Sequence, residues 1–267
     1  MSERIITSIV DHVATVTLNR ADKRNAIDMA MFKALIETAE SLAGEHTVRA
    51  IVLHGDGPDF CAGIDVSVFQ GAGIGVSVRE LLARRDGAAA NFVQHAVLAW
   101  RELPVPVIAA IRGSTIGGGL QIAMGADMRY AAADTHMSIM EIRWGLIPDM
   151  GITTTLRHVV AQDKVRELAY TGRLVSAEEA LNLGLVTEVV DDPLAKAMAT
   201  AAVIAQQSPD AIRAIKRLIN ESWDDDPGNS LLREAELQLA VLAGDNQREA
   251  ALASMENRPP NFRDPMS

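Results

Sequence analysis

The sequence contains a single cysteine, Cys61, among its 267 residues. One cysteine can form neither an intrachain disulfide nor a cysteine-based zinc site, so the sequence gives no indication of secretion. It also lacks an apolar run of about 18 residues, the length that would span a membrane. The N-terminus lacks the apolar core of a signal peptide. We therefore expect a cytoplasmic protein with no membrane partner.

Positive charge is also scarce. The chain has 25 Lys and Arg against 35 Asp and Glu, which gives a formal net charge of −10. This balance argues against nucleic acid as a partner, because such proteins carry basic surfaces. The six histidines show no pairing at metal-ligand spacing, so we expect no metal. Hydrophobic residues make up 48% of the chain, enough for a sizeable core.

The most informative stretch is 105–127, VPVIAAIRGSTIGGGLQIAMGAD. Its apolar segment 107–111 predicts a buried strand, and the glycines 117–119 begin an apolar segment of helical length. The first N–H groups of such a helix have no partner within it, and glycine lets the backbone approach a ligand closely. The stretch therefore predicts an oxyanion site. Taken alone, it fits a tight strand-to-helix connection equally well.

Alternating and helical patterns divide the rest of the chain. Strands are expected at 13–18, 50–54, 128–132, 136–139 and 185–190. Helices are expected after a cap at Asp28 or Asn25 and at 87–103, 153–160 and 163–170, with a capping box that begins at Ser176. A second glycine-rich turn follows strand 50–54. Segment 66–91 gives little signal, and its glycines at 71–75 indicate a loop.

Beyond Pro193 the pattern becomes entirely helical. Helices are expected at 194–207, from Pro209 onward, at 230–243 and at 246–255. We therefore predict a core of residues 1–192 and a helical region of residues 193–267. Alanine and leucine are frequent in the second region, and one helical layer cannot bury them all. We interpret it as an oligomerisation surface, with packing on the same subunit as the alternative.

Five motifs, in order along the chain, resemble the enoyl-CoA hydratase/isomerase family, the crotonases. They are FCAGID at 60–65, IGGGL at 116–120, ADMRYAA at 126–132, EIRWGLIP at 141–148 and TGRLVSAEEALNLGLV at 171–186. The resemblance covers about residues 9–264. It implies an α/β fold, a spiral of repeated ββα units, with a C-terminal α-helical region that forms homotrimers or hexamers. It also implies acyl-CoA thioester substrates and no separate cofactor, because CoA is part of the substrate.

The resemblance also assigns the reacting groups. It implies that the backbone N–H groups of Ile64 and Gly118 form an oxyanion hole for a thioester enolate. Hydratases of the family use two glutamates, and the corresponding positions here are Gln121 and Glu141. Glutamine can orient a water or a thioester but cannot take up a proton. Asp149 resembles the aspartate of dienoyl-CoA isomerases, although it also fits a turn or a helix cap. Glu141 in a surface ion pair is the structural alternative.

These residues favour isomerisation of an enoyl- or dienoyl-CoA, with Glu141 as the proton carrier and Asp149 as a helper. Hydration of a 2-enoyl-CoA is the alternative, because the same oxyanion hole serves it. A non-catalytic acyl-CoA-binding member, or another reaction such as thioester hydrolysis, dehalogenation or carbon–carbon bond cleavage, also stays open.

Residues for substrate and CoA binding follow from the same resemblance. Lys23 and Arg24 are expected at the CoA phosphates, with a solvated charge pair as the alternative. Ala62 and Asp65 flank the Ile64 donor, and the backbone near Ala62 is expected at the adenine. Gly117 completes this set.

Overall fold

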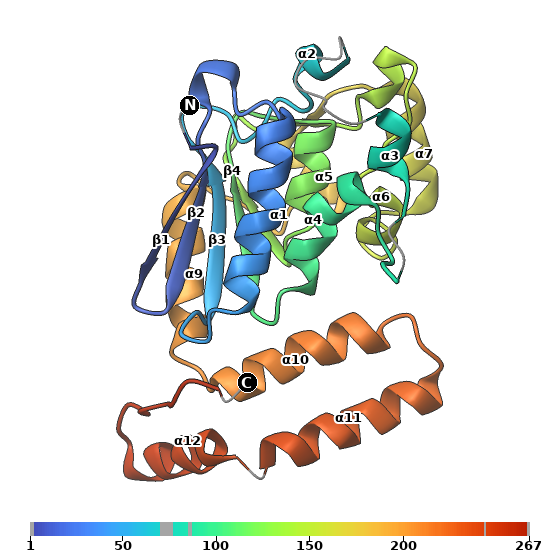
Figure 1. Ribbon diagram of the computed structural model, residues 1–267. Helices are drawn as coiled ribbons and strands as arrows, with labels where there is room; N and C mark the ends of the chain where they lie inside the picture. Colours follow the sequence, from blue (N-terminus) through green and yellow to red (C-terminus); the bar gives the residue numbers. More distant parts are fainter. Residues whose placement is uncertain (1–2, 70–76, 85–86, 243, 266–267) are drawn as a thin grey trace.

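A six-stranded, mostly parallel sheet forms the centre of the computed structural model, which describes residues 3–69, 77–84, 87–242 and 244–265 (Figure 1). Its order is β1 (Ile5–Val10), β2 (Val13–Leu18), β3 (Ala50–Gly55), β4 (Val107–Ile111), β6 (Met128–Ala131) and β9 (Glu188–Val189). Among the described strands of this sheet, β1 and β2 pair in antiparallel fashion and the other neighbours pair in parallel. A smaller sheet joins β5 (Ser114–Ile116), β7 (His136–Ser138) and β8 (Val175–Ser176). The α/β class predicted from the sequence is confirmed.

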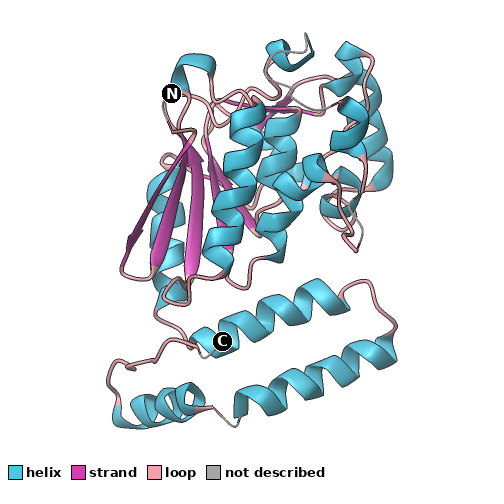
Figure 2. Ribbon diagram, viewed as in Figure 1, coloured by secondary structure: helices cyan, strands magenta, loops and turns pink. Residues whose placement is uncertain are grey.

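Helices cover both faces of the large sheet, as the colouring in Figure 2 makes visible. On one face, α1 (Met29–Ala43), α4 (Phe92–Glu102) and α5 (Gly118–Met124) pack over side chains such as Ile51 and Leu53. On the other, α9 (Pro193–Ala205) packs over Ala50 and Val52. Every residue of β4 is buried because both faces of that strand are covered. This explains the continuous apolar run at 107–111.

Helix α1 begins and ends where the sequence predicted. The Asp28 side chain accepts a hydrogen bond of 2.8 Å from the N–H of Met31, and Gly44 ends the helix. The alternative cap, Asn25, instead lies fully buried in the preceding turn. It follows a short 3-10 helix, η1 (Ala21–Lys23), and has a positive φ of 55°.

Several expected elements are shorter in the structure. The helix expected at 153–160 ends early, as α6 (Ile152–Thr155), because the N–H of Val159 closes a tight turn on the Leu156 carbonyl. The strand expected at 185–190 is reduced to β9, and α4 begins after an Asn91 cap rather than at residue 87. The capping box at Ser176 is half formed, because the Glu179 carboxylate pairs with Arg173 instead.

The remaining elements surround this core. They are α2 (Val66–Phe69), α3 (Val78–Leu82), the 3-10 helix η2 (Glu141–Trp144), α7 (Gln162–Thr171) and α8 (Ala177–Leu183). The loop expected at 71–75 lies outside the described residues. No helix in the described ranges is long and apolar enough to cross a membrane.

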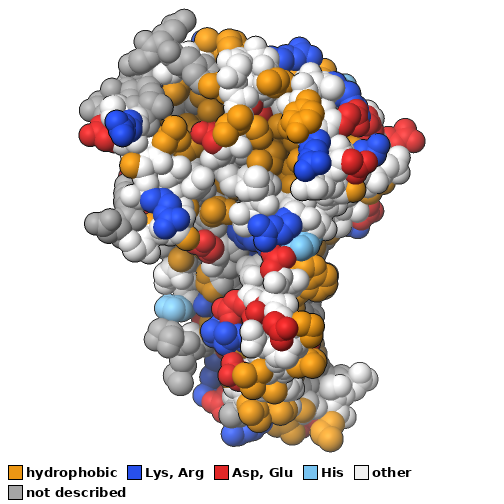
Figure 3. Space-filling view, turned by 90° about the vertical axis from the view of Figure 1, so that its right-hand side faces the viewer, with side chains coloured by type: hydrophobic (Ala, Val, Ile, Leu, Met, Phe, Trp, Pro, Cys, Tyr) orange, Lys and Arg blue, Asp and Glu red, His pale blue; other side chains and the backbone are white. Residues whose placement is uncertain are grey.

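Three helices form a separate layer below the sheet in Figure 1: α10 (Pro209–Ser222), α11 (Pro227–Leu242) and α12 (Asp245–Glu256). An ion pair joins this layer to the core, because Nζ of the buried Lys216 lies 2.8 Å from Oδ2 of the partly exposed Asp127. Apolar side chains gather on the layer in the lower part of Figure 3, and Trp223, Leu239 and Met255 are largely exposed. The division at residue 193 and the role of these helices in oligomerisation stay predictions.

Candidate active site

Two glycine-rich turns cross one another at the centre of the site. Cys61 and Thr115 form a parallel bridge, and the N–H of Ile116 donates to the Cys61 carbonyl at 3.0 Å. A Cβ atom on Gly119 would lie 2.4 Å from that same carbonyl oxygen. A Cβ on Gly63, whose φ is +94°, would lie 2.7 Å from the Ile116 oxygen. Glycine is required at both positions because the two backbones touch.

The crossing brings two backbone donors together. The N–H of Ile27 donates to the Gly63 carbonyl, and the N–H of Asp65 donates to the Ile27 carbonyl. Ile64 lies between Gly63 and Asp65 in this bridge, so its own N–H faces away from Ile27. Gly118 is the first residue of α5, where N–H groups lack partners within the helix. Within the part of the chain that the structure describes, neither N–H group donates to another residue. A Cβ built on Gly63, the residue before Ile64, would lie 3.8 Å from the Gly118 nitrogen, so two donors without a partner among the described residues lie close together.

Glu141 lies buried beside these donors, at the start of η2. Its Oε1 atom accepts a hydrogen bond of 2.7 Å from Gln121 Nε2 and lies 3.4 Å from the Cβ position of Gly117. Its Oε2 atom is buried without a hydrogen-bond partner among the described residues. Burial raises the pKa of Glu141, and the nearby charge of Asp149 raises it further. A surface ion pair, the structural alternative for Glu141, is therefore wrong.

Both the NH₂ group and the oxygen of the Gln121 amide form hydrogen bonds within the protein. Nε2 donates to Glu141, and Oε1 accepts a hydrogen bond of 2.8 Å from the N–H of Met150. The side chain is 1% exposed. The amide thus orients Glu141, which differs from the expectation that it orients a water or a thioester directly.

Asp149 lies on the turn that follows η2. Gly151, not Asp149, is the N-cap of α6, so the capping alternative is wrong. Burial raises the pKa of the Asp149 carboxyl. Because its charge also acts on Glu141, the site holds two interacting carboxyl groups.

Apolar atoms surround the backbone donors. The Cβ position of Gly118 lies 3.0 Å from both Ile27 Cδ1 and Met150 Sδ, and 3.4 Å from Ile64 Cγ1. Such surroundings lower the local dielectric and strengthen hydrogen bonds to a developing charge. An anion next to an apolar group fits such surroundings.

The residues expected to bind substrate have mixed surroundings. Arg24 is 60% exposed and pairs with Asp59 at 2.8 Å, so the charge-pair alternative describes it. The hydrogen bond from Arg24 lowers the pKa of Asp59 to about 2. Lys23 is exposed on η1, and Ala62 is half-buried with its N–H bonded to the Arg24 carbonyl. Their contacts with CoA stay predictions.

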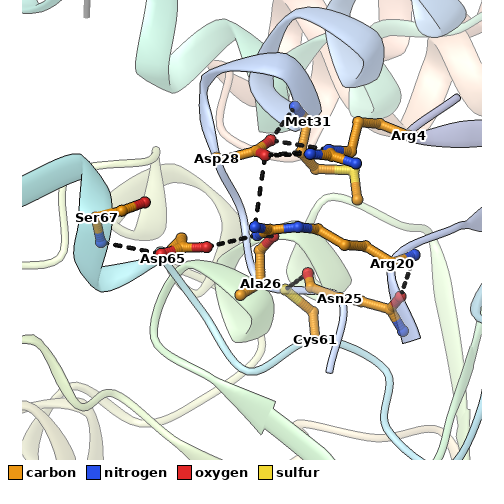
Figure 4. A network of polar contacts seen from close by, with 9 residues as sticks. All are labelled: Arg4, Arg20, Asn25, Ala26, Asp28, Met31, Cys61, Asp65 and Ser67. Atoms are coloured by element: carbon orange, nitrogen blue, oxygen red, sulfur yellow. Dashed lines mark hydrogen bonds and ion pairs between the residues drawn. The ribbon is translucent and has the colours of Figure 1, made fainter. Parts of the chain in front are cut away.

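Two further residues of that set already have partners within the chain. Gly117 has a φ of +53° and donates its N–H to the Ser138 carbonyl at 2.8 Å. The Asp65 carboxylate binds Arg20 and the N–H of Ser67, as Figure 4 shows. Asp65 is therefore better placed to hold the turn than to bind CoA. Arg20 was not among the residues predicted for the site, although it lies in the same segment as Lys23 and Arg24.

No cluster of three or more potential metal ligands occurs among the described residues. A surface cavity of about 590 Å³ lies at α1 and α4, lined in part by Lys33, Phe92 and His95. It shares no lining residue with the crossing of the two turns, so it is separate from this site.

Comparison with known proteins agrees with this geometry. A family model described as enoyl-CoA hydratase/isomerase matches residues 8–265. A human mitochondrial Delta(3,5)-Delta(2,4)-dienoyl-CoA isomerase is 33% identical over 95% of this chain and 79% of its own length. An enoyl-CoA hydratase of Mycobacterium tuberculosis is 31% identical over 94% of this chain and 93% of its own length.

Solved structures show the same fold. The crystal structure of a putative enoyl-CoA hydratase from Streptomyces coelicolor superposes with a TM-score of 0.89 at 32% identity, covering 98% of this chain and 94% of the other. An enoyl-CoA hydratase from Bacillus anthracis superposes with a TM-score of 0.88 at 28% identity, covering 98% of this chain and 100% of the other. The fold and the site thus define an enzyme with the crotonase fold. The chain belongs to the enoyl-CoA hydratase/isomerase family.

Proposed function

We propose that the protein isomerises a carbon–carbon double bond of an enoyl- or dienoyl-CoA thioester. The observation that carries this proposal is the state of the Glu141 carboxyl group. Gln121 holds one of its oxygens, while the other, Oε2, is buried and has no partner among the described residues. A buried carboxyl oxygen beside two backbone donors suits a single group that removes and returns a proton.

The reaction needs no group other than a proton carrier and an oxyanion hole. Glu141 Oε2 removes a proton from the carbon next to the thioester carbonyl, and the electron pair moves onto the carbonyl oxygen as an enolate. The N–H groups of Ile64 and Gly118 stabilise that oxygen; one such donor typically contributes about 2.7 to 4 kcal/mol. The enolate collapses when the proton returns to a different carbon. Substrate and product have the same formula, and no water enters.

The second acid position favours isomerisation over hydration. Hydration requires one group that activates a water and another that supplies a proton. Gln121 cannot exchange a proton, and its amide is already bonded to Glu141 and Met150. Asp149 supplies the second carboxyl, on the same turn as Met150. We assign it the role of helper, which keeps a proton near the far end of a conjugated chain.

Hydration of a 2-enoyl-CoA is the second candidate. A specific observation favours it, because the relatives include a protein named enoyl-CoA hydratase as well as one named dienoyl-CoA isomerase. In this case Asp149 takes the place of the missing glutamate. A non-catalytic acyl-CoA-binding role is less well supported, because a binding protein has no need of a buried, unpartnered carboxyl oxygen.

Substrate binding and assembly complete the proposal. The CoA portion binds at the backbone near Ala62 and Gly117, with Lys23 near its phosphates. Arg24 contributes there only if it leaves Asp59. The exposed apolar side chains of the helical layer form contacts between subunits in a homotrimer, or in a hexamer made of two trimers.

Three substrates separate the candidate reactions. The protein is incubated in ¹⁸O-water with 2-enoyl-, 3-enoyl- and 3,5-dienoyl-CoA, while thioester absorbance and product mass are followed. We expect double-bond migration in the 3-enoyl or dienoyl substrate without uptake of ¹⁸O. Efficient uptake of ¹⁸O into 2-enoyl-CoA, with no migration in the other substrates, would contradict isomerisation and establish hydration.

A further inference from the structure

A network of charged side chains has Arg20 at its centre and includes Asp65, the residue that follows Ile64 in the chain (Figure 4). Arg20 Nη1 lies 2.7 Å from Asp65 Oδ2 and donates to the Ala26 carbonyl, also at 2.7 Å. Its Nη2 atom lies 3.7 Å from Asp28 Oδ2. The Arg20 side chain is 11% exposed. One guanidinium group thus connects the turn at 20–28 to the turn that carries Ile64.

Asp65 transmits this contact to the donor, because it is the next residue after Ile64. Its carboxylate also accepts a hydrogen bond of 2.9 Å from the N–H of Ser67, and its own N–H donates to the Ile27 carbonyl. Hydrogen bonds from Ser67, together with Arg20, lower the pKa of Asp65 to about 2. The carboxylate is therefore ionised and paired at neutral pH.

Arg20 is itself held firmly at its backbone. Its N–H donates to Asn25 Oδ1 at 2.9 Å, and Asn25 is fully buried. Asn25 Nδ2 in turn donates to the carbonyls of Asp56 and Asp59, at 2.9 and 2.8 Å. These bonds fix the turn against the segment that leads into Cys61. The guanidinium therefore has a rigid support.

We propose that Arg20 is a positioning residue, which aims the N–H of Ile64 at the carbonyl oxygen of the substrate by holding the Asp65 carboxylate. This inference rests on the proposed function, since it assumes that the Ile64 N–H stabilises the enolate oxygen. Four contacts meet at Asp65: its N–H donates to the Ile27 carbonyl, its carbonyl accepts from the N–H of Val68, and its carboxylate accepts from the N–H of Ser67 and binds Arg20. Of these contacts, the one with Arg20 comes from a distant side chain. Removing the Arg20 contact therefore leaves the bonds within the turn in place, while the orientation of the turn is no longer fixed.

Arg20→Lys tests this role. Lysine keeps the charge but lacks the planar fork that binds Asp65 and the Ala26 carbonyl while facing Asp28. We expect kcat to fall about 10- to 100-fold, because a misplacement of about 1 Å can cost about 100-fold. KM is expected to change less than about threefold, because the enolate forms only after the substrate has bound.

The spectroscopic measurement is the infrared band of a ¹³C-labelled thioester carbonyl in a bound, unreactive acyl-CoA. A donor aimed at this oxygen moves the band to lower wavenumber. We expect a clear shift in the parent and a smaller one in Arg20→Lys, at equal occupancy. Asp65→Asn provides a second variant, which keeps the side chain's size but removes its charge, and it should reduce the shift in the same way.

Arg4→Gln is the matched control, because Arg4 pairs with Asp28 at 2.7 Å in the same network but is not among the partners of Asp65 drawn in Figure 4. Its carbonyl shift and kcat should stay within about twofold of the parent. A parent protein without a carbonyl shift would contradict the proposed function itself. A full shift and full kcat in Arg20→Lys and Asp65→Asn would overturn the positioning role alone, as would an equal loss in Arg4→Gln.

Discussion

Replacing Glu141 by glutamine should abolish the reaction while leaving the fold intact. The substitution is isosteric, and the new amide oxygen can still accept the hydrogen bond from Gln121 Nε2, which is 2.7 Å in the parent. The new NH₂ group takes the place of the buried, unpartnered Oε2 atom. Glutamine cannot carry a proton, so only the oxyanion hole and substrate binding remain.

The expected loss follows from the contribution of a positioned proton carrier. General acid–base catalysis contributes about 10²- to 10⁴-fold in rate. At about 1.36 kcal/mol per factor of ten, this corresponds to about 2.7 to 5.4 kcal/mol in the activation barrier. KM should change little, because Oε2 is assigned to the proton and not to binding.

The same substitution should stabilise the protein above acidic pH. Burial raises the pKa of Glu141, so the folded state holds the proton more tightly than the unfolded state. Ionisation therefore costs stability as the pH rises above the ordinary glutamate pKa of about 4.3. Glutamine does not titrate. The difference in melting temperature between variant and parent should thus be small near pH 4 and grow toward neutral pH.

Both effects are measured with purified protein. Turnover of the best 3-enoyl or dienoyl substrate gives kcat and KM, and thermal melts followed by circular dichroism at several pH values give the stability difference. Glu37→Gln, at an exposed position on α1, serves as the control and should retain parent activity. Full turnover by Glu141→Gln on every substrate that the parent accepts would refute the assignment of the proton carrier.

Three further substitutions test other parts of the site and fold. Gln121→Glu places a second carboxyl beside Glu141, so the pair should retain a proton to higher pH. The apparent pKa in the pH profile of kcat/KM should rise by at least about one unit. An unchanged pH profile would contradict the contact between positions 121 and 141. Gly119→Ala puts a Cβ 2.4 Å from a backbone oxygen and should lower kcat about 100-fold, whereas Gly44→Ala, which meets only an ordinary contact of 3.7 Å, should not. Asp127→Asn leaves the buried ammonium group of Lys216 without its carboxylate partner and should reduce the free energy of unfolding in urea by about 3 kcal/mol; an unchanged urea midpoint would refute this value.

Local signals predicted much of the fold. Strand β4 occupies residues 107–111 as expected. A short run with no polar residue is buried on both sides only where both faces of the sheet are covered. The cap at Asp28, one of the two expected candidates, also lies where its side chain predicted. The helix expected from residue 153 is shorter, because the turn after it is set by contacts that periodicity does not record.

Fewer features of the candidate site could be predicted from local sequence patterns. The glycine turn at Gly118 predicted an oxyanion site, but its partner at Ile64 was assigned only through resemblance to a family, because the two turns meet through tertiary structure. The hydrogen bond between Gln121 and Glu141 joins residues twenty positions apart on different elements. Arg20 escaped notice for the same reason, since its carboxylate partner Asp65 lies on another turn.

Because both ends of its amide are hydrogen-bonded, Gln121 acts as a spacer between the carboxyl group of Glu141 and the backbone of Met150. Its amide fixes Glu141 at one end and the backbone of Met150 at the other. Met150 also lies against Gly118. A substitution that moves the Met150 backbone should therefore also move the Glu141 carboxyl group. Substrate range and pH profile should change together in laboratory evolution of this protein, and a change of chain-length preference without loss of rate should require compensating substitutions at position 121.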